Sequence, residues 1–540
     1  MTSQGSYWLV YLRSPIRSTF DKPQWNLEHL GLATIAAAMV RSGRPAEILN
    51  AAQLDLDVKD VLEILVKAHP KFVGFSPTCM TMSDSLWLAK ELKGRLPDTH
   101  ICLGGQQATM AAARIITDCL AIDSIVCGYG EKTISPLLDT LENGGVLADV
   151  KGICWRDPSG RAVHNPMQLV TLASRANALW PRRDKESIDQ GIFTIETSRG
   201  CPNHCAFCVT PMFRSSQGLS GWDARQADNV VDEIEYLCRR SPQVDRVSIS
   251  MIDDNFIINT PASKQRAADI AHGVIERRLR TSFWFMAAPC TFSAKDSTLL
   301  SLLREAGFAC ILLGIESRDM ERLRAYGKPW EPSHADQTIR LLSEYGFVLH
   351  CSMILFHPYA TFTEILRNAR YIADLLKRPA MTTYTTYASR LLIFPGVPLA
   401  TQLAKDGLLS AIESYTDPQA YRFIDSRVEL LHRYLVLLEG DLAAVDWSIY
   451  DTRSVVYPAV CADKSSPRLR AVWHTTEQVI RDVTGRSYQG FCRAAGAAER
   501  LDEPALETAV EKYRRELQQC SQLLAGLGDV RAMVKEGVRQ

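Results

Sequence analysis

The sequence has no excess of charge of either sign, because 61 lysine and arginine residues balance 61 aspartate and glutamate residues. A neutral chain has no global field to draw it onto nucleic acid or an anionic membrane, so we expect no nucleic-acid binding and a small or neutral partner. The sequence also has no stretch of about 18 uncharged apolar residues and no basic amino terminus leading into an apolar run. It therefore predicts a cytoplasmic protein without a membrane span.

The fifteen cysteines are an odd number scattered through 540 residues, unlike the dense, even set of a small disulfide scaffold. They therefore favour a reducing compartment. Five lie in or beside apolar, strand-like runs, where a free cysteine behaves as a small hydrophobe: Cys79, Cys102, Cys127, Cys310 and Cys351. Cys201, Cys205 and Cys208 differ, because they place three thiols close together in a segment punctuated by glycine and proline.

Residues 1–157 alternate short apolar strands with amphipathic helices, which predicts an α/β, doubly wound, Rossmann-like domain around a parallel sheet. The segment 121–130 is predicted to be its last strand. Such sheets bind ligands at the carboxyl ends of their strands. The candidate ligand-binding residues follow three of these strands: Ser76, Thr78, Gly104, Gly105, Gln106, Gly128, Tyr129, Gly130 and Glu131. The glycines would let a ligand approach the backbone closely, and a tight turn explains them equally well.

Three further regions follow this domain. Residues 158–190 carry prolines and a charged run and are predicted to be a linker. Residues 191–399 hold about six strand–helix units, which suit an open, partial (β/α)6 TIM barrel whose final strand is predicted at 389–394. Residues 400–540 show helical periodicity and are predicted to form a helical carboxyl-terminal domain that either shapes the substrate cavity or only caps and dimerises.

The segment TSRGCPNHCAFCVTP places three thiols as Cys-x3-Cys-x2-Cys in a loop after the strand FTIETS, where barrel active sites form. Thiolates are the usual ligands of iron–sulfur clusters, and three of them leave one iron of a four-iron cluster open to another ligand. A zinc site is the alternative, but a closed zinc site needs four ligands in paired spacings. The spacing therefore predicts an iron–sulfur cluster.

This motif resembles that of the radical SAM superfamily, and the resemblance runs through the predicted barrel core. It implies a 4Fe-4S cluster that binds S-adenosylmethionine and cleaves it to a 5'-deoxyadenosyl radical, with an electron from an external donor such as flavodoxin or ferredoxin. It further implies that Phe207 packs beside the adenine and that Asp254 lies near the methionine end. Glu316 and Ser317, in a Gly-Ile-Glu-Ser segment, would lie close to the nucleoside and methionyl groups. A carboxylate can accept both ribose hydroxyls.

Residues 1–157 resemble the cobalamin-binding domain that precedes the barrel in one branch of this superfamily. The likeness lies in WNLEHLGLATIAAAM, VGFSPT, CLGGQQAT and IVCGYGEKTISPLL. It makes cobalamin the expected ligand of the loop residues that follow the three strands. The chain lacks an Asp-x-His-x-x-Gly motif, a lack that many members of the branch share, so the lower ligand of cobalt would be another group or absent.

Where members of this branch usually run Gly-Phe-Pro-Gly-Glu-Thr, the chain has LFHPYAT. His357 and Tyr359 are therefore candidate catalytic acids, bases or substrate-binding groups, with loop packing as the alternative. Four aromatic residues near strand ends either line a substrate pocket or pack in the core: Trp284, Phe285, Tyr384 and Tyr387.

Both resemblances together predict a cobalamin-dependent radical SAM methyltransferase. It would methylate an unactivated carbon of a natural-product or metabolite intermediate, a small molecule or a peptide. A radical cyclase or rearrangement enzyme without net methylation is the alternative. An iron–sulfur electron carrier or redox sensor would need no nucleoside pocket, and a transfer-RNA methylthiotransferase would usually carry further cluster cysteines and a basic appendage.

Overall fold

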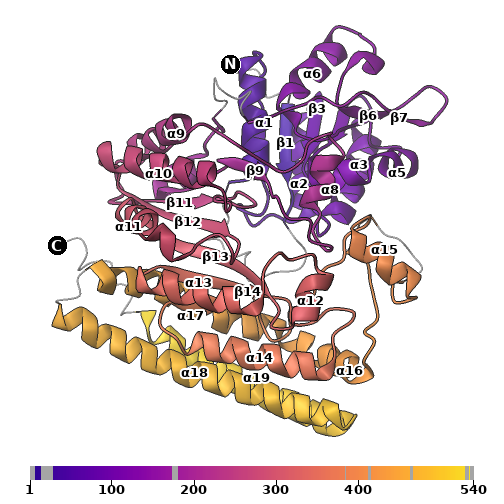
Figure 1. Cartoon of the computed structure of the whole chain (residues 1–540). Coiled ribbons are helices and arrows are strands. Elements are labelled where there is room, and N and C mark those ends of the chain that lie inside the picture. The colour runs from indigo at the N-terminus through magenta and orange to yellow at the C-terminus, as the bar shows by residue number, and fades with distance from the viewer. Residues whose placement is uncertain are drawn as a thin grey trace. The chain divides into compact units, whose positions relative to one another are not determined.

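A computed structural model describes residues 7–13, 28–172, 180–383, 385–410, 415–416, 418–462, 466–528 and 534. Figure 1 colours the elements in chain order. The chain divides into two compact units that alternate along the sequence. Unit 1 comprises residues 1–202, 208–244 and 412–419, and unit 2 comprises residues 203–207, 245–411 and 420–540.

Unit 1 is built on a seven-stranded sheet in the order β2-β1-β3-β4-β5-β6-β7. The first five strands are β1 (Tyr7–Tyr11), β2 (Glu47–Asn50), β3 (Phe72–Phe75), β4 (His100–Leu103) and β5 (Ser124–Val126). The helices between and after them are α1 (Leu30–Arg41), α2 (Val58–Ala68), α3 (Met82–Arg95), α4 (Gly105–Met110), α5 (Ala112–Asp118) and α6 (Ile134–Glu142). Strand β1 pairs in parallel with both β2 and β3, so the order reverses there and the sheet is doubly wound, as predicted.

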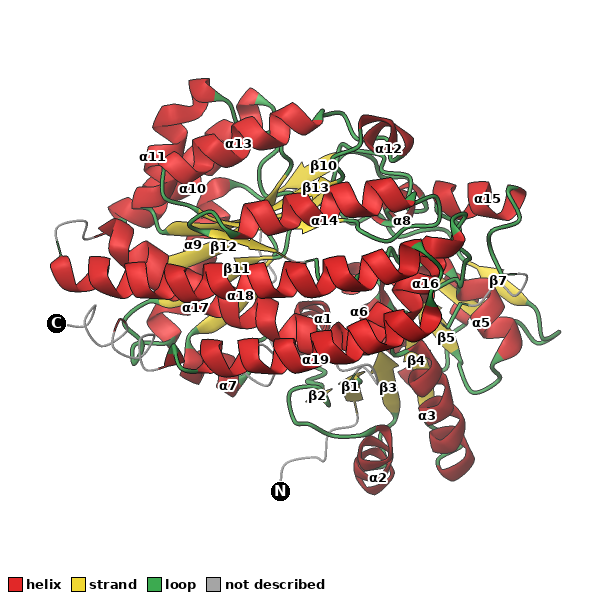
Figure 2. Cartoon of the chain, turned by 90° about the horizontal axis from the view of Figure 1, so that it is seen from below, coloured by secondary structure: helices red, strands yellow, loops and turns green. Residues whose placement is uncertain are grey.

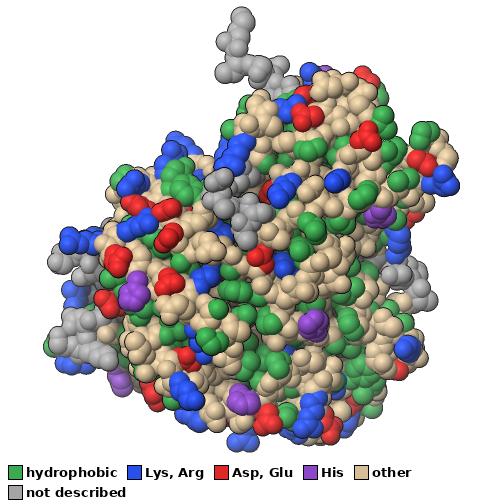
Figure 3. Space-filling view, turned by 45° about the horizontal axis from the view of Figure 1, so that its top comes forward, with side chains coloured by type: hydrophobic (Ala, Val, Ile, Leu, Met, Phe, Trp, Pro, Cys, Tyr) green, Lys and Arg blue, Asp and Glu red, His purple; other side chains and the backbone are tan. Residues whose placement is uncertain are grey.

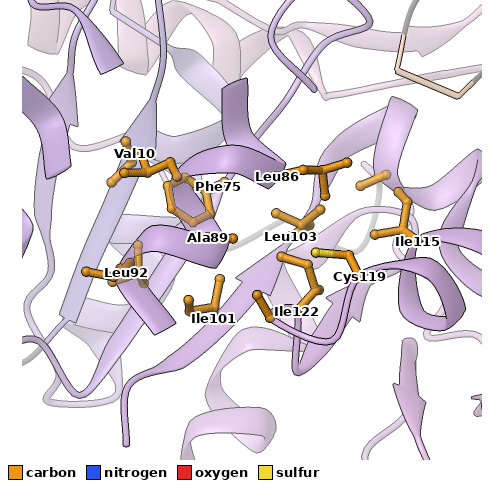
Figure 4. Packing of buried hydrophobic residues seen from close by; sticks show 14 of the residues in the cluster. Val10, Phe75, Leu86, Ala89, Leu92, Ile101, Leu103, Ile115, Cys119 and Ile122 are labelled. Carbon is orange, nitrogen blue, oxygen red and sulfur yellow. The ribbon is translucent and has the colours of Figure 1, made fainter. Parts of the chain in front are cut away.

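Apolar side chains cover both faces of this sheet. Val10, Ile101 and Leu103 pack with α2, α3 and α5 in one core (Figure 4). Their sequence neighbours Leu9 and Cys102 face the other way and pack with α1 and α6. Because successive residues of a strand point to opposite faces, a sheet that is buried on both sides reads as continuous apolar runs.

Two antiparallel strands extend the sheet beyond β5, so the prediction that the sheet ends at 121–130 is wrong. β6 (Ile153–Arg156) pairs with β5, and β7 (Ala162–His164) pairs with β6. The Asp157 carboxylate closes their turn by accepting hydrogen bonds from the backbone N–H of Ser159 at 2.9 Å and of Arg161 at 3.0 Å. The segment predicted as a linker contains β7 and also α7 (Lys185–Gln190).

Apart from a short two-stranded sheet, six strands alternate with helices between residues 192 and 383, as predicted for a partial barrel. The strands are β8 (Ile192–Ile195), β11 (Val247–Met251), β12 (Thr281–Ala287), β13 (Phe308–Glu316), β14 (Val348–Met353) and β15 (Met381–Thr383). The helices are α8 (Thr210–Ser215), α9 (Ala227–Arg240), α10 (Pro261–Glu276), α11 (Ser297–Glu305), α12 (Met320–Ala325), α13 (Pro332–Glu344) and α14 (Phe362–Leu376). Within unit 2, β11 to β15 pair in parallel and in chain order, so their carboxyl ends share one edge.

The last strand is β15, and the prediction of a strand at 389–394 is wrong. The hydroxyls of Thr382 and Thr383 donate to the carbonyls of Leu349 and Cys351 on β14, both at 3.1 Å. The later residues make only an isolated parallel bridge, between Arg390 and Phe356 in the segment after β14, where the Leu391 N–H donates to the carbonyl of Phe356 at 2.7 Å. An apolar run alone does not decide which segment pairs with the sheet.

The carboxyl-terminal region is helical, as its periodicity predicts. Its helices are α15 (Pro398–Lys405), α16 (Ser426–Leu435), α17 (Glu439–Ala462), α18 (Pro467–Glu499) and α19 (Glu503–Ala525). Helices α18 and α19 lie side by side (Figure 2). A Cβ atom at Gly490 on α18 would lie 2.1 Å from the ring of Tyr513 on α19, so glycine allows the two helices to pack this closely.

A buried arginine ties α17 to α18 and to the barrel within unit 2. Arg453 is fully buried and binds both carboxylate oxygens of Glu477 on α18, at 2.9 and 2.7 Å. It also donates to the backbone carbonyl of Met381 at the start of β15. Arg453 thereby fixes the position of α17 along β15.

The surface carries charges of both signs. Lysine and arginine side chains are interspersed with aspartate and glutamate on the face drawn in Figure 3, as expected of a chain without net charge. None of the helices in the described ranges is long and apolar enough to cross a membrane.

Candidate active site

The cysteine motif begins directly after a short strand of unit 1. β9 (Ser198–Gly200) pairs antiparallel with β10 (Trp222–Ala224) and ends at the residue before Cys201. Gly200 has φ 86°, and a Cβ atom there would lie 2.3 Å from the carbonyl oxygen of Gly221. Glycine is therefore required at this position, and it sets the direction in which the cysteine loop leaves the strand.

Residues 203–207 of the motif belong to unit 2, where two backbone hydrogen bonds hold them. Ala206 donates its N–H to the carbonyl of Tyr326 at 3.0 Å and accepts from the N–H of Leu399 at 2.9 Å. Lys328 is a hydrogen-bond partner of the buried Cys205 thiol. A positive charge beside a thiol favours the thiolate, which is the form that binds iron.

The donor chemistry of this loop fits an iron–sulfur cluster. Cys201, Cys205 and Cys208 are free thiols, and Lys328 beside Cys205 would offset part of the negative charge of the ligands. In the described part of the chain, no three His, Cys, Asp or Glu side chains already converge as a metal site. The three cysteines remain the predicted ligands on their chemistry and spacing.

Glu316 ends β13 in a strained backbone conformation. Its φ is 68°, and the register between β13 and β14 shifts between Gly314 and Glu316. Its buried carboxylate accepts a hydrogen bond from the ammonium of Lys328 at 2.8 Å. Strained non-glycine residues persist where the surrounding structure holds them and cluster at functional sites, so this geometry supports the predicted role of Glu316.

Phe207 lies near the same lysine, and Ser317 directly follows Glu316 in the chain. Ser317 is fully buried, and its hydroxyl accepts a hydrogen bond from the N–H of Asp319 at 3.0 Å. The partly exposed ring of Phe207 packs edge-on against Tyr326, with 5.1 Å between the ring centroids, and Lys328 lies 5.1 Å from its centroid. Phe207 offers a ring surface that suits a nucleoside, whereas the Ser317 hydroxyl also donates to Glu364 at 3.4 Å and is used within the protein.

Asp254 follows the carboxyl end of β11 and is half-buried. Its neighbour Asp253 is almost fully buried. Phe256 packs against Phe285 and Phe308 at centroid distances of 5.4 Å. Phe285 is thus a core residue rather than a pocket residue.

The other aromatic candidates fall in different places. Trp284 is half-buried and Tyr387 is 4% exposed, whereas Tyr384 lies outside the described residues.

His357 and Tyr359 both have partners in the loop after β14. His357 is almost fully buried and hydrogen-bonds Glu364 at 3.1 Å. Burial lowers the pKa of His357, and the Glu364 carboxylate opposes this. The hydroxyl of Tyr359 donates to Asp406 at 2.6 Å. Each partner positions its side chain, so loop packing accounts for these contacts.

The predicted cobalamin loops follow β3, β4 and β5, three neighbouring parallel strands of unit 1. Ser76 follows β3 beside the point where the strand order reverses. Gly105 has φ 85° and Gly128 has φ 83°, so both loops use conformations that favour glycine. The Thr109 hydroxyl accepts a hydrogen bond from the Gly128 N–H at 3.0 Å and joins two of the loops.

Three residues that the sequence pattern did not indicate surround the last of these loops. Arg199 donates to Glu131 at 2.6 Å, and its guanidinium lies 3.8 Å from the ring centroid of Tyr129. Gln217 accepts from the Tyr129 N–H at 3.1 Å, and Arg214 packs against Gly200. The sole sequence signal for Arg199 is its place two residues before Cys201.

Several buried polar atoms in this region have no hydrogen-bond partner among the described residues: Glu131 Oε2, Arg199 Nη1, Arg214 Nε and Arg214 Nη1. A buried donor or acceptor without a partner costs free energy until a ligand or water satisfies it. Cobalamin carries amide side chains around its ring and a phosphate on its tail. The loop residues and these unused atoms therefore fit such a ligand.

Two protein-family models match the sequence, one in each of the two predicted cofactor-binding regions. The B12 binding domain matches residues 20–138, and the radical SAM superfamily matches residues 195–372. The chain is a radical SAM enzyme with a B12-binding domain. Its domains imply a 4Fe-4S cluster, S-adenosylmethionine and cobalamin as cofactors.

Relatives of this radical SAM enzyme include two reaction types. An uncharacterized methyltransferase of Pyrococcus horikoshii is 26% identical, over 75% of this chain and 83% of that protein. The anaerobic magnesium-protoporphyrin IX monomethyl ester cyclase of Rubrivivax gelatinosus is also 26% identical, over 59% of this chain and 57% of that protein. The family is therefore clear, and the reaction is not fixed by it.

One solved structure shares the fold over nearly the whole chain. It is that of the cobalamin-dependent S-adenosylmethionine radical enzyme OxsB, with aqua-cobalamin and S-adenosylmethionine bound. It is 17% identical, covers 98% of this chain and 81% of its own, and gives a TM-score of 0.70.

Proposed function

We propose that this radical SAM enzyme is a cobalamin-dependent C-methyltransferase, which methylates an unactivated carbon of a small-molecule or peptide intermediate. The observation that carries the proposal is the pairing of a B12-binding domain with a radical SAM domain in one chain. The methyltransferase relative, aligned over three quarters of the chain, supports it. When bound, the cluster and S-adenosylmethionine would supply a hydrogen-abstracting radical, and cobalamin a transferable methyl group.

Particular residues would prepare the site for this chemistry. The cysteines of the loop would ligate the cluster, and Glu316 with Phe207 would orient the nucleoside. Glu131 and Tyr129, held by Arg199, would present the cobalamin loop. The carboxyl edge of the unit 2 sheet would place the substrate carbon within about 3 to 4 Å of the radical. Such positioning makes a bimolecular reaction effectively unimolecular and so lowers its barrier.

Product stoichiometry tests the proposal. The enzyme, reconstituted without oxygen, would be given S-adenosylmethionine carrying a deuterated methyl group, a chemical reductant and a metabolite extract. Methyl transfer consumes one S-adenosylmethionine to S-adenosylhomocysteine and a second to 5'-deoxyadenosine and methionine. We expect S-adenosylhomocysteine and 5'-deoxyadenosine in equal amounts, together with a deuterated methyl group in one extract component.

A radical cyclase or rearrangement enzyme is the second candidate, and the cyclase relative is the observation that favours it. It predicts 5'-deoxyadenosine without matching S-adenosylhomocysteine. That result would reject methyl transfer in favour of this candidate. An electron carrier or sensor predicts neither product.

A further inference from the structure

Glu364 is a buried carboxylate that contacts three side chains from three segments of unit 2. It lies in the first turn of α14, is 5% exposed, and donates its backbone N–H to the Thr361 hydroxyl at 3.2 Å. Its Oε1 atom accepts from the Ser317 hydroxyl at 3.4 Å and from the His357 ring at 3.1 Å, and Nε of Arg322 lies 3.5 Å away. A carboxylate only accepts hydrogen bonds, so the His357 nitrogen at this contact carries its proton. One oxygen thus connects the segment after β13, the helix α12 and the loop after β14.

Glu364 is ionised at neutral pH. Burial raises the pKa of Glu364, but its contacts with His357 and Arg322 more than offset this and hold the pKa below its usual value. Hydrogen bonds to an ionised acceptor are shorter and stronger than those to a neutral one. The three segments are therefore held firmly at this carboxylate.

Through Ser317, Glu364 supports the strained residue Glu316. Ser317 is fully buried, and its hydroxyl also accepts a hydrogen bond from the N–H of Asp319 at 3.0 Å. On the other side, the carbonyl of Glu316 accepts from the N–H of Ile354 at 2.8 Å. A residue with φ 68° keeps this conformation only while its surroundings hold it. Ser317 is the next residue in the chain, and Glu364 fixes its side chain.

The strained backbone sets the direction of the Glu316 carboxylate. The register between β13 and β14 shifts between Gly314 and Glu316. A Cβ atom at Gly314 would lie 2.7 Å from Oε1 of Glu316, so the carboxylate lies over this glycine. The same oxygen accepts from Lys328 at 2.8 Å. A relaxed backbone at Glu316 would turn the carboxylate away from this place.

Glu364 also supports the ring of Phe207. His357, which Glu364 holds, packs edge-on against Tyr326 with 5.8 Å between the ring centroids. The Tyr326 ring in turn packs edge-on against Phe207 with 5.1 Å between the centroids. Two residues predicted to bind the nucleoside, Glu316 and Phe207, are thus connected to the same carboxylate.

We propose that Glu364 is a positioning residue for S-adenosylmethionine, because it holds Glu316 and Phe207 in the arrangement that binds the nucleoside. Its partner His357 lies in the segment LFHPYAT, where the chain departs from the run that is usual in its branch. The contact with Glu364 gives this departure a role. The inference rests on the nucleoside role predicted for Glu316 and Phe207, and not on methyl transfer.

Binding of 5'-deoxyadenosine to the reconstituted full chain tests the inference, because this probe carries the nucleoside without the methionyl group. Calorimetry measures its dissociation constant well below the melting temperature of each variant. We expect Glu364→Ala to weaken binding by about tenfold or more, because the strained binding residue is no longer held in place. Glu364→Gln keeps the volume and one acceptor oxygen, so it should fold and should lose less affinity than Glu364→Ala.

Reductive cleavage of S-adenosylmethionine gives a second readout. Glu364 acts on nucleoside binding in the ground state and in the transition state alike. Glu364→Ala should therefore raise KM for S-adenosylmethionine by a similar factor and leave kcat nearly unchanged. A lowered kcat with an unchanged KM would overturn the inference.

A double-variant cycle shows whether Ser317 acts through Glu364. Ser317→Ala removes one end of their hydrogen bond and Glu364→Ala the other, so the double variant should bind 5'-deoxyadenosine about as Glu364→Ala does. Additive losses of affinity would mean that the two residues act independently, and they would overturn the inference.

Asp374→Asn is the matched control, because Asp374 lies on the same helix and pairs at the surface with Lys377 at 3.2 Å. It should bind 5'-deoxyadenosine as the wild type does. A lowered melting temperature of Glu364→Ala with wild-type affinity would overturn the inference in favour of a purely structural role. So would wild-type affinity in Glu316→Ala, because Glu316 would then bind no nucleoside for Glu364 to position.

None of these measurements needs a methyl acceptor. An enzyme that shows the expected losses of affinity but transfers no methyl group therefore contradicts the proposed function alone. An enzyme that transfers methyl groups but keeps wild-type nucleoside affinity in Glu364→Ala contradicts the positioning role alone.

Discussion

The guanidinium of Arg199 on β9 donates to the carboxylate of Glu131 at 2.6 Å and joins β9 to the segment after β5, 68 residues away in the sequence. Glu131 belongs to a predicted cobalamin loop, and Arg199 precedes Cys201 by two residues. Burial lowers the pKa of Arg199, but Glu196 and Glu131 more than offset this and raise it above its usual value. The guanidinium therefore stays protonated, and it connects the predicted cobalamin loop to the strand that leads into the predicted cluster loop.

Replacement of Arg199 should destabilise the enzyme and weaken its hold on cobalamin. Arg199→Met leaves Glu131 and Glu196 without their cation, which should cost about 3 to 5 kcal/mol in the free energy of unfolding. Urea unfolding measures this, and absorbance after gel filtration measures retained cobalamin. Arg161→Met, at an exposed arginine, is the control. Wild-type stability and full cobalamin retention in Arg199→Met would show that the contact is incidental.

Each cysteine of the motif should be needed for the cluster. Cys201→Ala, Cys205→Ala and Cys208→Ala should each lose most of the iron, sulfide and cluster absorbance after reconstitution, because two thiolates hold a cubane poorly. Cys492→Ala, at an exposed cysteine of α18, should keep them all. A variant of the three that retains the wild-type iron content would remove that cysteine from the ligand set.

The buried pair of Arg453 and Glu477 should behave as one unit. Arg453→Met alone leaves the buried Glu477 carboxylate without its cation and should lower the free energy of unfolding by about 3 to 5 kcal/mol. The double variant Arg453→Met, Glu477→Met should recover much of that loss, because the uncompensated charge is gone. Thermal or urea unfolding of the wild type, both single variants and the double variant gives the coupling energy. Additive losses would contradict the pairing.

Two glycines of α18 should respond in opposite directions to the same substitution. Gly490→Ala places a Cβ atom against the ring of Tyr513 and should destabilise the helical region by about 1 to 3 kcal/mol or more. Gly485→Ala meets no atom within 4 Å and should stabilise the helix by about 0.5 to 1 kcal/mol. Unfolding curves compare the two. A stable Gly490→Ala protein would mean that α18 and α19 can separate at little cost.

Acid should weaken the fold partly through His350. Burial lowers the pKa of His350 to about 3, whereas the unfolded chain binds the proton near pH 6.5. As the pH falls, the unfolded state therefore binds a proton before the folded state does. The contribution of neutral His350 to the free energy of unfolding is complete above pH 6.5 and is lost as the pH falls toward 3, by up to about 1.4 kcal/mol per pH unit. His350→Phe should flatten the stability profile between pH 6.5 and 4. If the stability of the wild type and of His350→Phe changed with pH in parallel, protonation of His350 would cost the folded state no free energy.

The features that local pattern determines were predictable from the sequence. Strands β1 to β5 and the loops at their carboxyl ends follow from continuous apolar runs and from glycines after strands. The three thiols are recognisable because they lie within one short loop. The periodicity of α16 and α19 likewise identifies their buried faces.

Features that depend on distant partners were not predictable. The contact of Arg199 with Glu131 and that of Lys328 with Glu316 need the folded chain to bring their loops together. The threonine tract of β15 and the apolar run 389–394 are equally good strand candidates locally, and only the hydrogen bonds to β14 decide between them.

The contacts of Tyr415 form late during synthesis, long after the domain that they cover has left the ribosome. Its carbonyl accepts a hydrogen bond from the Gln107 amide at 2.7 Å, its ring lies 5.0 Å from the guanidinium of Arg114, and it packs against the apolar core beneath α5. Gln107 leaves the ribosome 308 residues earlier. At typical rates of elongation, this face of the nascent domain stays without Tyr415 for about 15 to 60 s. The first domain is therefore synthesised early but receives this contact late. A truncated polypeptide that ends before residue 415 would leave this part of the apolar core uncovered.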